Sequence, residues 1–322
     1  MNTRIIEWDS ECESLGRAVA AIGVFDGVHT GHRALISDTV SLAHEHDALS
    51  VIVTFDRDPE QIVMPESNVP QLLTLEDKLA HIKHLNVDAI LVIPFCMRLA
   101  SMTPQHFLDD VLLETLTPLA VVVGRDFRFG SHANGTVQTL QRYGKEHHFA
   151  VVAHDLVERD GTPVTSTRIR KLIAQGEVTA ACRLLGRPHR VPGRVVHGRG
   201  EGKSLLGVPT ANITPWSYAA LPADGVYAGR IRHGNASYHA AISVGLPPTF
   251  PEATDCLEAH LIGFDGDLYD QEIVLEFEQR LRDQQPFTST DDLTLAIRSD
   301  IEHADKITSS PNSPCGSEDT DA

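Results

Sequence analysis

Two histidines, His29 and His32, follow a glycine-rich turn near the start of the chain and could act on a phosphate group. They belong to the string Gly-Val-Phe-Asp-Gly-Val-His-Thr-Gly-His at residues 23–32. Gly27 and Gly31 let a phosphate approach the backbone at a helix N-terminus, where free N–H groups favour an anion. Two imidazoles three residues apart share one helix face and can donate to phosphoryl oxygens as negative charge grows on them. The alternatives are a metal pair or two solvated side chains.

A second set of phosphate-binding residue types opens a later helix. Ser166, Thr167, Arg168 and Arg170 bring two hydroxyls and two guanidinium groups to the start of that helix. Such a site can hold the β and γ phosphates of ATP while the first turn holds the α phosphate. Arginine can neutralise a departing pyrophosphate, so Arg168 is a candidate catalytic residue. The alternative is a helix cap with solvated charges.

The C-terminal part of the chain carries its own phosphate and metal signals. Gly198, Gly202 and Lys203 lie in a segment that packs three glycines and two cations into six residues. A glycine-rich segment alone is often only a mobile turn. Thr210 and Asn212 follow it two residues apart, so their side chains share one face of an extended segment. A hydroxyl and an amide oxygen placed in this way can bind Mg²⁺ held by ATP phosphates.

A third pattern combines aromatic rings with a cation. The residues are Asp126, Phe127, Arg128 and Phe129. Aromatic faces and a guanidinium group suit a flat heteroaromatic ligand that bears phosphate. The alternative is a loop whose rings pack inward.

These residues need elements that position them, and the first half of the chain alternates between two patterns. Buried strands are predicted at residues 18–24, 49–55, 88–95, 119–123 and 149–153. Helices are predicted between them, from residue 31, at 74–85, 103–116 and 137–147, and then from 165 to 176. Strands that alternate with helices indicate an α/β fold, a Rossmann-like doubly wound parallel sheet with helices on both faces.

The periodicity changes after Gly186, where we place a domain boundary. Short alternating strands are predicted at residues 190–197, 226–231, 238–244, 257–264 and 273–277. A helix follows at about 290–304, and these elements predict a small antiparallel β-barrel domain with a C-terminal helix. The predicted organisation is therefore a first domain at 1–186, a barrel domain at 187–306 and a disordered acidic tail at 307–322.

Composition bounds the function. The chain has 322 residues, with 27 basic and 44 acidic side chains and a formal net charge of −17. This charge argues against loose binding to nucleic acid or to an anionic membrane. The five cysteines are widely spaced without a Cys-x-x-Cys pair, which is typical of reduced thiols. No basic segment followed by an apolar one opens the chain, so we expect a cytoplasmic protein that does not bind membranes.

The first string resembles the signature of the nucleotidylyltransferase superfamily, and in its full length it is similar to the FAD synthetase half of bacterial bifunctional riboflavin kinase/FAD synthetases. The resemblance adds Gly23, Phe25 and Asp26 to the expected nucleotide-binding residues. It matches residues 165–170 to the Ser-Ser-Thr-x-x-Arg motif of the superfamily. It also implies that the string from Asp126 to Phe129 belongs to the flavin and nucleotide pocket.

The barrel part resembles riboflavin kinases through its Pro-Thr-Ala-Asn string at residues 209–212. In that family, a glutamate in the strand ahead of an Asp-Leu-Tyr string is the catalytic base, which implies this role for Glu258. Without the resemblance, Glu258 would be interpreted as an exposed strand residue. A further match implies that Arg282 lies near the flavin.

The resemblance implies two reactions. The barrel phosphorylates riboflavin with ATP as co-substrate and Mg²⁺ as cofactor, and the first domain transfers AMP from ATP to FMN, forming FAD and pyrophosphate. One alternative is a nucleotidylyltransferase for another phosphorylated acceptor, with an accessory barrel, and another is a non-catalytic flavin or nucleotide sensor. The sequence is compatible with a monomer or a homo-oligomer. Departures from the family pattern are expected to alter affinity, at Arg57, Asp58, Val208, Pro247 and Asp270.

Overall fold

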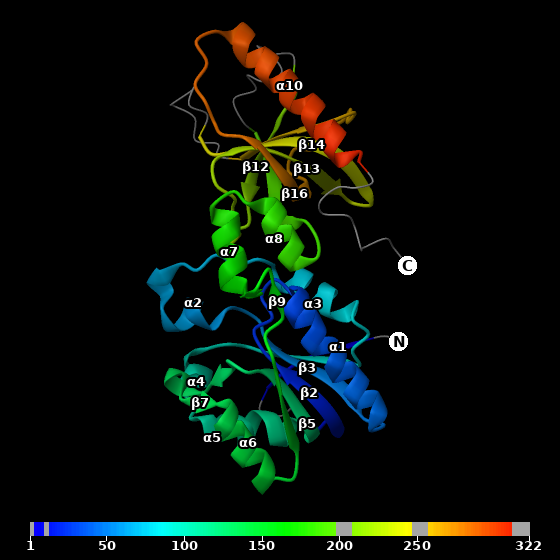
Figure 1. Cartoon of the computed structure of the whole chain (residues 1–322), viewed down its shortest axis with the longest axis vertical. Coiled ribbons are helices and arrows are strands. Elements are labelled where there is room, and N and C mark those ends of the chain that lie inside the picture. Colours follow the sequence, from blue (N-terminus) through cyan, green and yellow to red (C-terminus); the bar gives the residue numbers. More distant parts are fainter. Residues whose placement is uncertain (1–2, 10–12, 198–207, 247–256, 311–322) are drawn as a thin grey trace. The chain divides into compact units, whose positions relative to one another are not determined.

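The computed structural model describes residues 3–9, 13–197, 208–246 and 257–310 (Figure 1). The chain forms two compact units. The first holds the residues up to 69 and those from 73 to 165. The second holds residues 70–72 and the chain from 166 onward, so that a short segment from the N-terminal half belongs to it.

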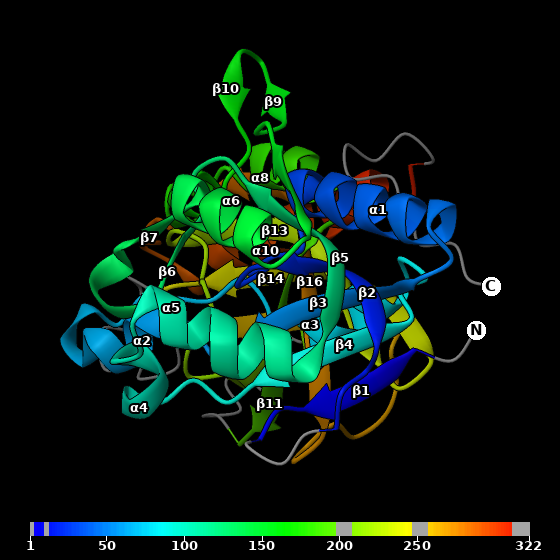
Figure 2. The same ribbon diagram turned by 90° about the horizontal axis from the view of Figure 1, so that it is seen from below.

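The first unit is built on a six-stranded parallel sheet, which confirms the predicted α/β architecture. Its strands are β1 (Arg4–Glu7), β2 (Arg17–Ile22), β3 (Leu49–Phe55), β4 (Ala89–Ile93), β5 (Thr117–Gly124) and β8 (Ala150–His154). Their order is β1-β4-β3-β2-β5-β8, and Figure 2 shows the arrows from β1 to β5 in this sequence. The strand β1 was not predicted; it is an edge strand of four residues that begins with arginine and ends with glutamate.

Helices cover both faces of this sheet because its strands are apolar on both sides. In β2, Ala18 and Ala20 face one core cluster, and Val19 and Ala21 face the other. The helices α1 (Thr30–Glu45) and α3 (Leu75–Lys83) pack on the second cluster. The π-helical segment η2 (Phe107–Leu113) and α6 (Val137–Glu146) pack on the first.

Two predicted helix starts are confirmed. Thr74 caps α3, because its hydroxyl accepts from the backbone N–H of Asp77 at 3.1 Å. Thr103 caps α5 (Pro104–His106) in the same way, with proline at the first helical position. Short elements complete the unit: α2 (Pro59–Val63), η1 (Pro65–Ser67), α4 (Met97–Ala100), α5 (Pro104–His106), β6 (Arg128–Phe129), η3 (Ser131–Ala133), β7 (Gly135–Thr136), β9 (Glu158–Arg159) and β10 (Thr162–Pro163).

The second unit starts with two helices that lie before the predicted boundary at Gly186, and it continues into a closed antiparallel barrel, which was predicted. The helices are α7 (Ser166–Ala174) and α8 (Val178–Leu185). The barrel strands are β11 (His189–Val196), β12 (Ala211–Pro215), β13 (Gly225–His233), β14 (Ala236–Val244), β15 (Leu257–Leu261) and β16 (Glu272–Arg282), in the order β11-β12-β15-β14-β13-β16. The final helix, α10 (Thr290–Thr308), ends four residues beyond the predicted end at residue 304. The disordered tail was predicted from residue 307, but residues 307 and 308 belong to α10, and the part of the tail from residue 311 lies outside the described residues.

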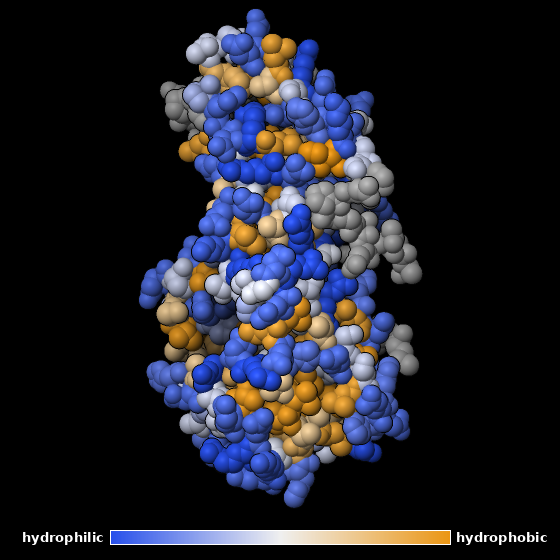
Figure 3. Space-filling model, in the orientation of Figure 1, coloured by the Kyte–Doolittle hydropathy of each residue, from blue (hydrophilic) through white to orange (hydrophobic). Residues whose placement is uncertain are grey.

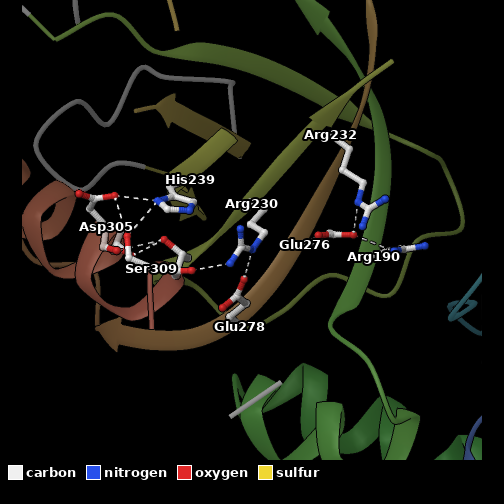
Figure 4. Close-up of polar contacts among 10 residues, drawn as sticks. Arg190, Arg230, Arg232, His239, Glu276, Glu278, Asp305 and Ser309 are labelled. Carbon is white, nitrogen blue, oxygen red and sulfur yellow. Dashed lines mark hydrogen bonds and ion pairs between the residues drawn. The ribbon is translucent and has the colours of Figure 1, made fainter. Parts of the chain in front are cut away.

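Two glutamates of β16 are buried on the barrel and paired with arginines (Figure 4). Glu276 accepts from Arg190 and from Arg232, at 2.8 Å in each case. Glu278 accepts from Arg230 at 2.8 Å. Because a buried carboxylate without a partner is costly, these arginines are needed where the two glutamates lie.

The last turn of α10 is tied to the barrel by polar contacts. The guanidinium group of Arg230 donates to the carbonyl of Thr308, and His239 contacts the carboxylate of Asp305 at 2.7 Å. These contacts use the orphan carbonyls and the side chains of the C-terminal turn. The barrel and its helix therefore form one packed body.

The molecular surface carries mixed polarity. In Figure 3, apolar colour gathers over the part of the visible face where Figure 1 places β2 and β5. The edge strand β8, beside β5, exposes Val152 with 39% of its surface accessible. Within the described ranges, no helix is long and apolar enough to cross a membrane.

The expectation of reduced thiols is wrong for one cysteine. Cys182, which is buried in α8, is disulfide-bonded. Cys96 is an exposed free thiol.

Candidate active sites

The turn that follows β2 has a strained backbone. Phe25, Gly27 and Val28 have φ angles of 53°, 83° and 36°, in the left-handed region that bulky side chains rarely adopt. Each such non-glycine residue costs about 1–3 kcal/mol, and strain of this kind clusters at functional sites. The turn lies where the chain passes from β3 and β4 on one side of β2 to β5 on the other. Ligands of α/β sheets bind at such a switch point.

The structure brings His29 and His32 together at the start of α1. Their rings stack with centroids 3.6 Å apart and planes inclined by 16°. His29 is buried and caps the helix, since its Nδ1 accepts from the backbone N–H of His32 at 3.2 Å. The ring of Phe25 meets His32 edge-on at 5.2 Å. The predicted shared helix face is therefore present.

Both imidazoles are held in defined states. Because Nδ1 of His29 accepts a hydrogen bond, the neutral ring carries its proton on Nε2. Burial lowers the pKa of His32 well below 6.5, and its electrostatic interactions with His29 and Lys78 lower it further. His32 is thus neutral at pH 7 and can donate one N–H to a phosphoryl oxygen.

Two glycines make room for these rings. A Cβ on Gly31 would lie 3.2 Å from the His29 ring, and a Cβ on Gly23 would lie 3.0 Å from the Phe25 ring. Asp26, between them in the turn, is buried. At both glycines a side chain would therefore push against a neighbouring ring.

The string from Asp126 to Phe129 follows β5, the strand next to β2. Phe127 and Phe129 stack with centroids 5.4 Å apart, and both pack against the core of the first unit. The inward packing given above as the alternative is thus observed for the rings. Asp126 and Arg128 are exposed, and a flavin-binding role for the string stays a prediction.

Ser166, Thr167, Arg168 and Arg170 lie in α7, in the second unit, whereas the two histidines lie in the first. Their predicted position at a helix start is observed. Their common action with His29 and His32 on one ATP molecule stays a prediction.

The barrel strands place Asn212 directly opposite Glu258. Glu258 is also paired in register with Ser243 of β14. In both strands the neighbouring residues, such as Ile213 and Ala259, belong to the barrel core, so Asn212 and Glu258 share its outer face. Side chains opposite each other in an antiparallel pair lie about 5 Å apart at Cβ. Amide and carboxylate groups therefore meet at one place.

The amide oxygen of Asn212 fits a cation site. Among the described residues, this buried oxygen has no hydrogen-bond partner. Thr210, two residues earlier, is partly buried. Hydroxyl and amide oxygens suit Mg²⁺, which keeps several ligands from water and phosphate. In the described part of the chain, no group of three or more His, Cys, Asp or Glu side chains could hold a metal ion.

Other predicted residues of the barrel have different outcomes. Gly198, Gly202 and Lys203 lie outside the described residues. Arg282 is held by Asp300 of α10, with the shortest N–O distance 2.7 Å, and its guanidinium group lies 5.7 Å from the Phe287 ring centroid. Its role near a flavin stays a prediction.

The departures from the family pattern have local explanations at two positions. Asp58 caps α2 by accepting from the backbone N–H of Glu60 at 3.0 Å. Asp270 has a φ of 61°, a left-handed conformation that aspartate tolerates better than most residues. Val208 is buried, Arg57 pairs with Asp56 at 2.7 Å, and Pro247 lies outside the described residues.

Lys78, which is only 6% exposed, was not among the predicted site residues. Its Nζ donates to the carbonyls of Val24 and Phe55, at 3.2 and 2.6 Å. The only available signal was its place four residues after the capping Thr74, and lysine at such a position is usually solvated.

Comparison with known proteins gives matches to both halves of the chain. Residues 11–168 match the FAD synthetase family, and residues 185–308 match the riboflavin kinase family. A bifunctional riboflavin kinase/FMN adenylyltransferase of Pseudomonas fluorescens is 37% identical over 88% of this chain and 90% of its own length. The protein of the same description from Escherichia coli K12 is 32% identical, over 88% and 90%.

A solved structure has the same fold along nearly the whole chain. It is a crystal structure described as a macrolide-efflux protein from Streptococcus pneumoniae. It superposes with a TM-score of 0.83 and 29% sequence identity, covering 93% of this chain and 98% of that one.

Proposed function

This chain belongs to the family of bifunctional riboflavin kinase/FMN adenylyltransferases, and on that premise we propose how its residues make FAD from riboflavin in two steps. The observation that carries the proposal is that both family matches occur in one chain, in order and without overlap, at residues 11–168 and 185–308. The enzyme phosphorylates riboflavin to FMN and then adenylylates FMN.

In the second step, a phosphate oxygen of FMN attacks the α phosphorus of ATP, and the bond to the bridging oxygen of pyrophosphate breaks. His29 and His32 donate to the α-phosphoryl oxygens, on which charge grows in the transition state. Gly23, Phe25, Asp26, Gly27 and Gly31 shape the turn that receives the nucleotide. The helix start at Ser166, Thr167, Arg168 and Arg170 binds the β and γ phosphates. Asp126, Phe127 and Arg128 contact FMN, and the buried Phe129 supports this string by stacking on Phe127. The stacked neutral imidazoles support this assignment.

In the first step, the terminal hydroxyl of riboflavin attacks the γ phosphorus of ATP, and ADP leaves. Glu258 accepts the hydroxyl proton. Its register opposite Asn212 supports this role, because it places the base beside the proposed metal ligand. The segment with Gly198, Gly202 and Lys203 binds the ATP phosphates, and Arg282 lies near the flavin.

Thr210 and Asn212 are the residues that would hold Mg²⁺. The unpartnered buried amide oxygen supports this assignment. When bound, the ion neutralises charge on the ATP phosphates. The protein's own contribution is to fix two oxygens next to the general base.

A product assay tests the proposal. Incubation with riboflavin, ATP and Mg²⁺ is expected to give FMN and then FAD on chromatography. A protein that forms neither flavin, but adenylylates another phosphorylated acceptor, would be the nucleotidylyltransferase with an accessory barrel. A protein that binds flavin or nucleotide without turnover would be the sensor. Either result would contradict the proposal.

We also propose that the enzyme works in the cytoplasm, where its substrates ATP and riboflavin are available. Fractionation of the source cells tests the location. Light scattering of the purified chain measures its oligomeric state.

A further inference from the structure

We infer that Lys78 is a positioning residue for the N-terminal site, because its buried ammonium group ties the strained turn after β2 to the end of β3. This inference rests on the proposed adenylylation of FMN. Lys78 is presented by α3, whose start is fixed by the Thr74 cap.

The two carbonyls that Lys78 contacts belong to neighbouring strand ends. Val24 directly precedes Phe25, the first strained residue of the turn, and Phe55 is the last residue of β3. The Nζ atom lies 3.2 Å from the first carbonyl oxygen and 2.6 Å from the second. Thr54 of β3 also donates to the Val24 carbonyl, at 3.1 Å. A strained turn persists only where its surroundings fix it, and these contacts do so.

Lys78 also brings a positive charge into this buried region. Burial lowers its pKa to about 8, although the carboxylates of Asp26, Asp58 and Asp56 raise it. The ammonium group is therefore mostly charged at pH 7. Its charge is one of the causes that keep the pKa of His32 below 6.5, together with burial and His29. Lys78 thus helps to keep the His32 imidazole, which is proposed to bind the α phosphate, in its neutral form.

Removal of Lys78 is expected to loosen the turn and to change its charge. Lys78→Met keeps an apolar stem of similar length but loses both hydrogen bonds. The rate of FAD formation from FMN should fall about 100-fold, because small displacements of catalytic groups have effects of this size. FMN formation by the barrel should stay within about twofold, since it needs none of these residues. Lys83→Met, on the exposed side of the same helix, is the matched control and should leave both reactions unchanged.

A pH profile separates positioning from a merely structural role. In the wild type, kcat/KM for FAD formation should fall near pH 8, because Lys78 then loses its proton and its hydrogen bonds to the two carbonyls are no longer charge-assisted. In Lys78→Arg this alkaline limb should move to higher pH, because guanidinium stays charged. The position of the limb can be read even from a slow variant, so this comparison also decides the case if Lys78→Met does not fold.

Two results would overturn the inference. One is full FAD formation by Lys78→Met, and the other is an alkaline limb that is the same in the wild type and in Lys78→Arg. A wild-type protein that forms no FAD would instead contradict the proposed function, so the two failures are distinguishable.

Discussion

Gly31 shows, at the scale of single residues, how a missing side chain shapes a site. In the interior of a helix, replacement of glycine by alanine usually stabilises by about 1 kcal/mol. At Gly31 the added Cβ would lie 3.2 Å from Nδ1 and Cε1 of His29, so the ring must shift. The ring shift would weaken the contact between His29 and the backbone N–H of His32.

We therefore expect Gly31→Ala to separate stability from activity. Its melting temperature should stay close to that of the wild type, while FAD formation falls about tenfold through misplacement of the imidazole. Calorimetry and the FMN-to-FAD rate check the two parts. A variant with a wild-type rate would show that the ring contact does not matter for transfer.

His189 makes the stability of the barrel unit depend on pH. It is fully buried, and its Nε2 donates to the carbonyl of Ala220 at 2.7 Å. Burial lowers its pKa to about 4, whereas the unfolded chain has a value near 6.5. Below pH 6.5 the unfolded state binds a proton that the folded state does not bind. The free energy of unfolding should therefore fall by about 2 kcal/mol between pH 7 and pH 5.

Urea unfolding at the two pH values measures this contribution. In His189→Gln the amide keeps a donor without titrating, so the loss between pH 7 and pH 5 should be about 2 kcal/mol smaller than in the wild type. His303→Gln, an exposed change on α10, is the control and should behave as the wild type does. Equal pH dependence in His189→Gln and the wild type would contradict the assignment.

At the scale of elements, two of the three glutamates of the strand β16 have contrasting surroundings. Glu276 is 3% exposed and lies between Arg190 and Arg232, whereas Glu272 is 81% exposed and pairs with Arg194 at 3.2 Å. Glu276→Gln leaves two arginines around a neutral amide and should lower the free energy of unfolding by about 3 kcal/mol. Glu272→Gln is the matched control and should change it by less than about 1 kcal/mol. Equal values for the two variants in urea unfolding would show that burial of the pair has no effect.

The elements that could be predicted from sequence are those with a strong local signal. The central strands have continuous apolar runs, and α3 has the Thr74 cap, so each was located within a few residues. The strand β1 could not be found because its four residues are polar at both ends, and only pairing with β4 makes it a strand.

The geometry of a site was predictable only where it depends on local spacing in the sequence. The His29 and His32 stack follows from helical spacing. The place of Glu258 opposite Asn212 depends on barrel register, which the sequence does not contain. The burial of Lys78 depends on carbonyls from two distant strands, so no local pattern indicates it.

At the scale of the whole molecule, the two reactions use different residues of one chain and should be separable by mutation. His32→Ala removes a hydrogen-bond donor to the α phosphate of ATP and is expected to stop FAD formation while FMN accumulates from riboflavin. Glu258→Gln removes the general base and should stop FMN formation while supplied FMN is still converted to FAD. Chromatography of both reactions for each variant checks this.

Each variant is thereby a control for the folding of the other half. Loss of both reactions in a folded variant would show that the residue assignment is wrong.

The second unit does not consist of barrel strands alone. Val178 of α8 is fully buried in the barrel core. From far earlier in the chain, Gln71 donates to the Tyr218 carbonyl at 2.6 Å and accepts from the Ala220 N–H at 2.9 Å. A fragment that starts at residue 187 would lack both Val178 and Gln71. The loss of the buried Val178 side chain alone would lower the free energy of unfolding of the barrel by about 1.5–3 kcal/mol. We therefore expect a stable fragment with the kinase barrel to need both α8 and the segment 70–72.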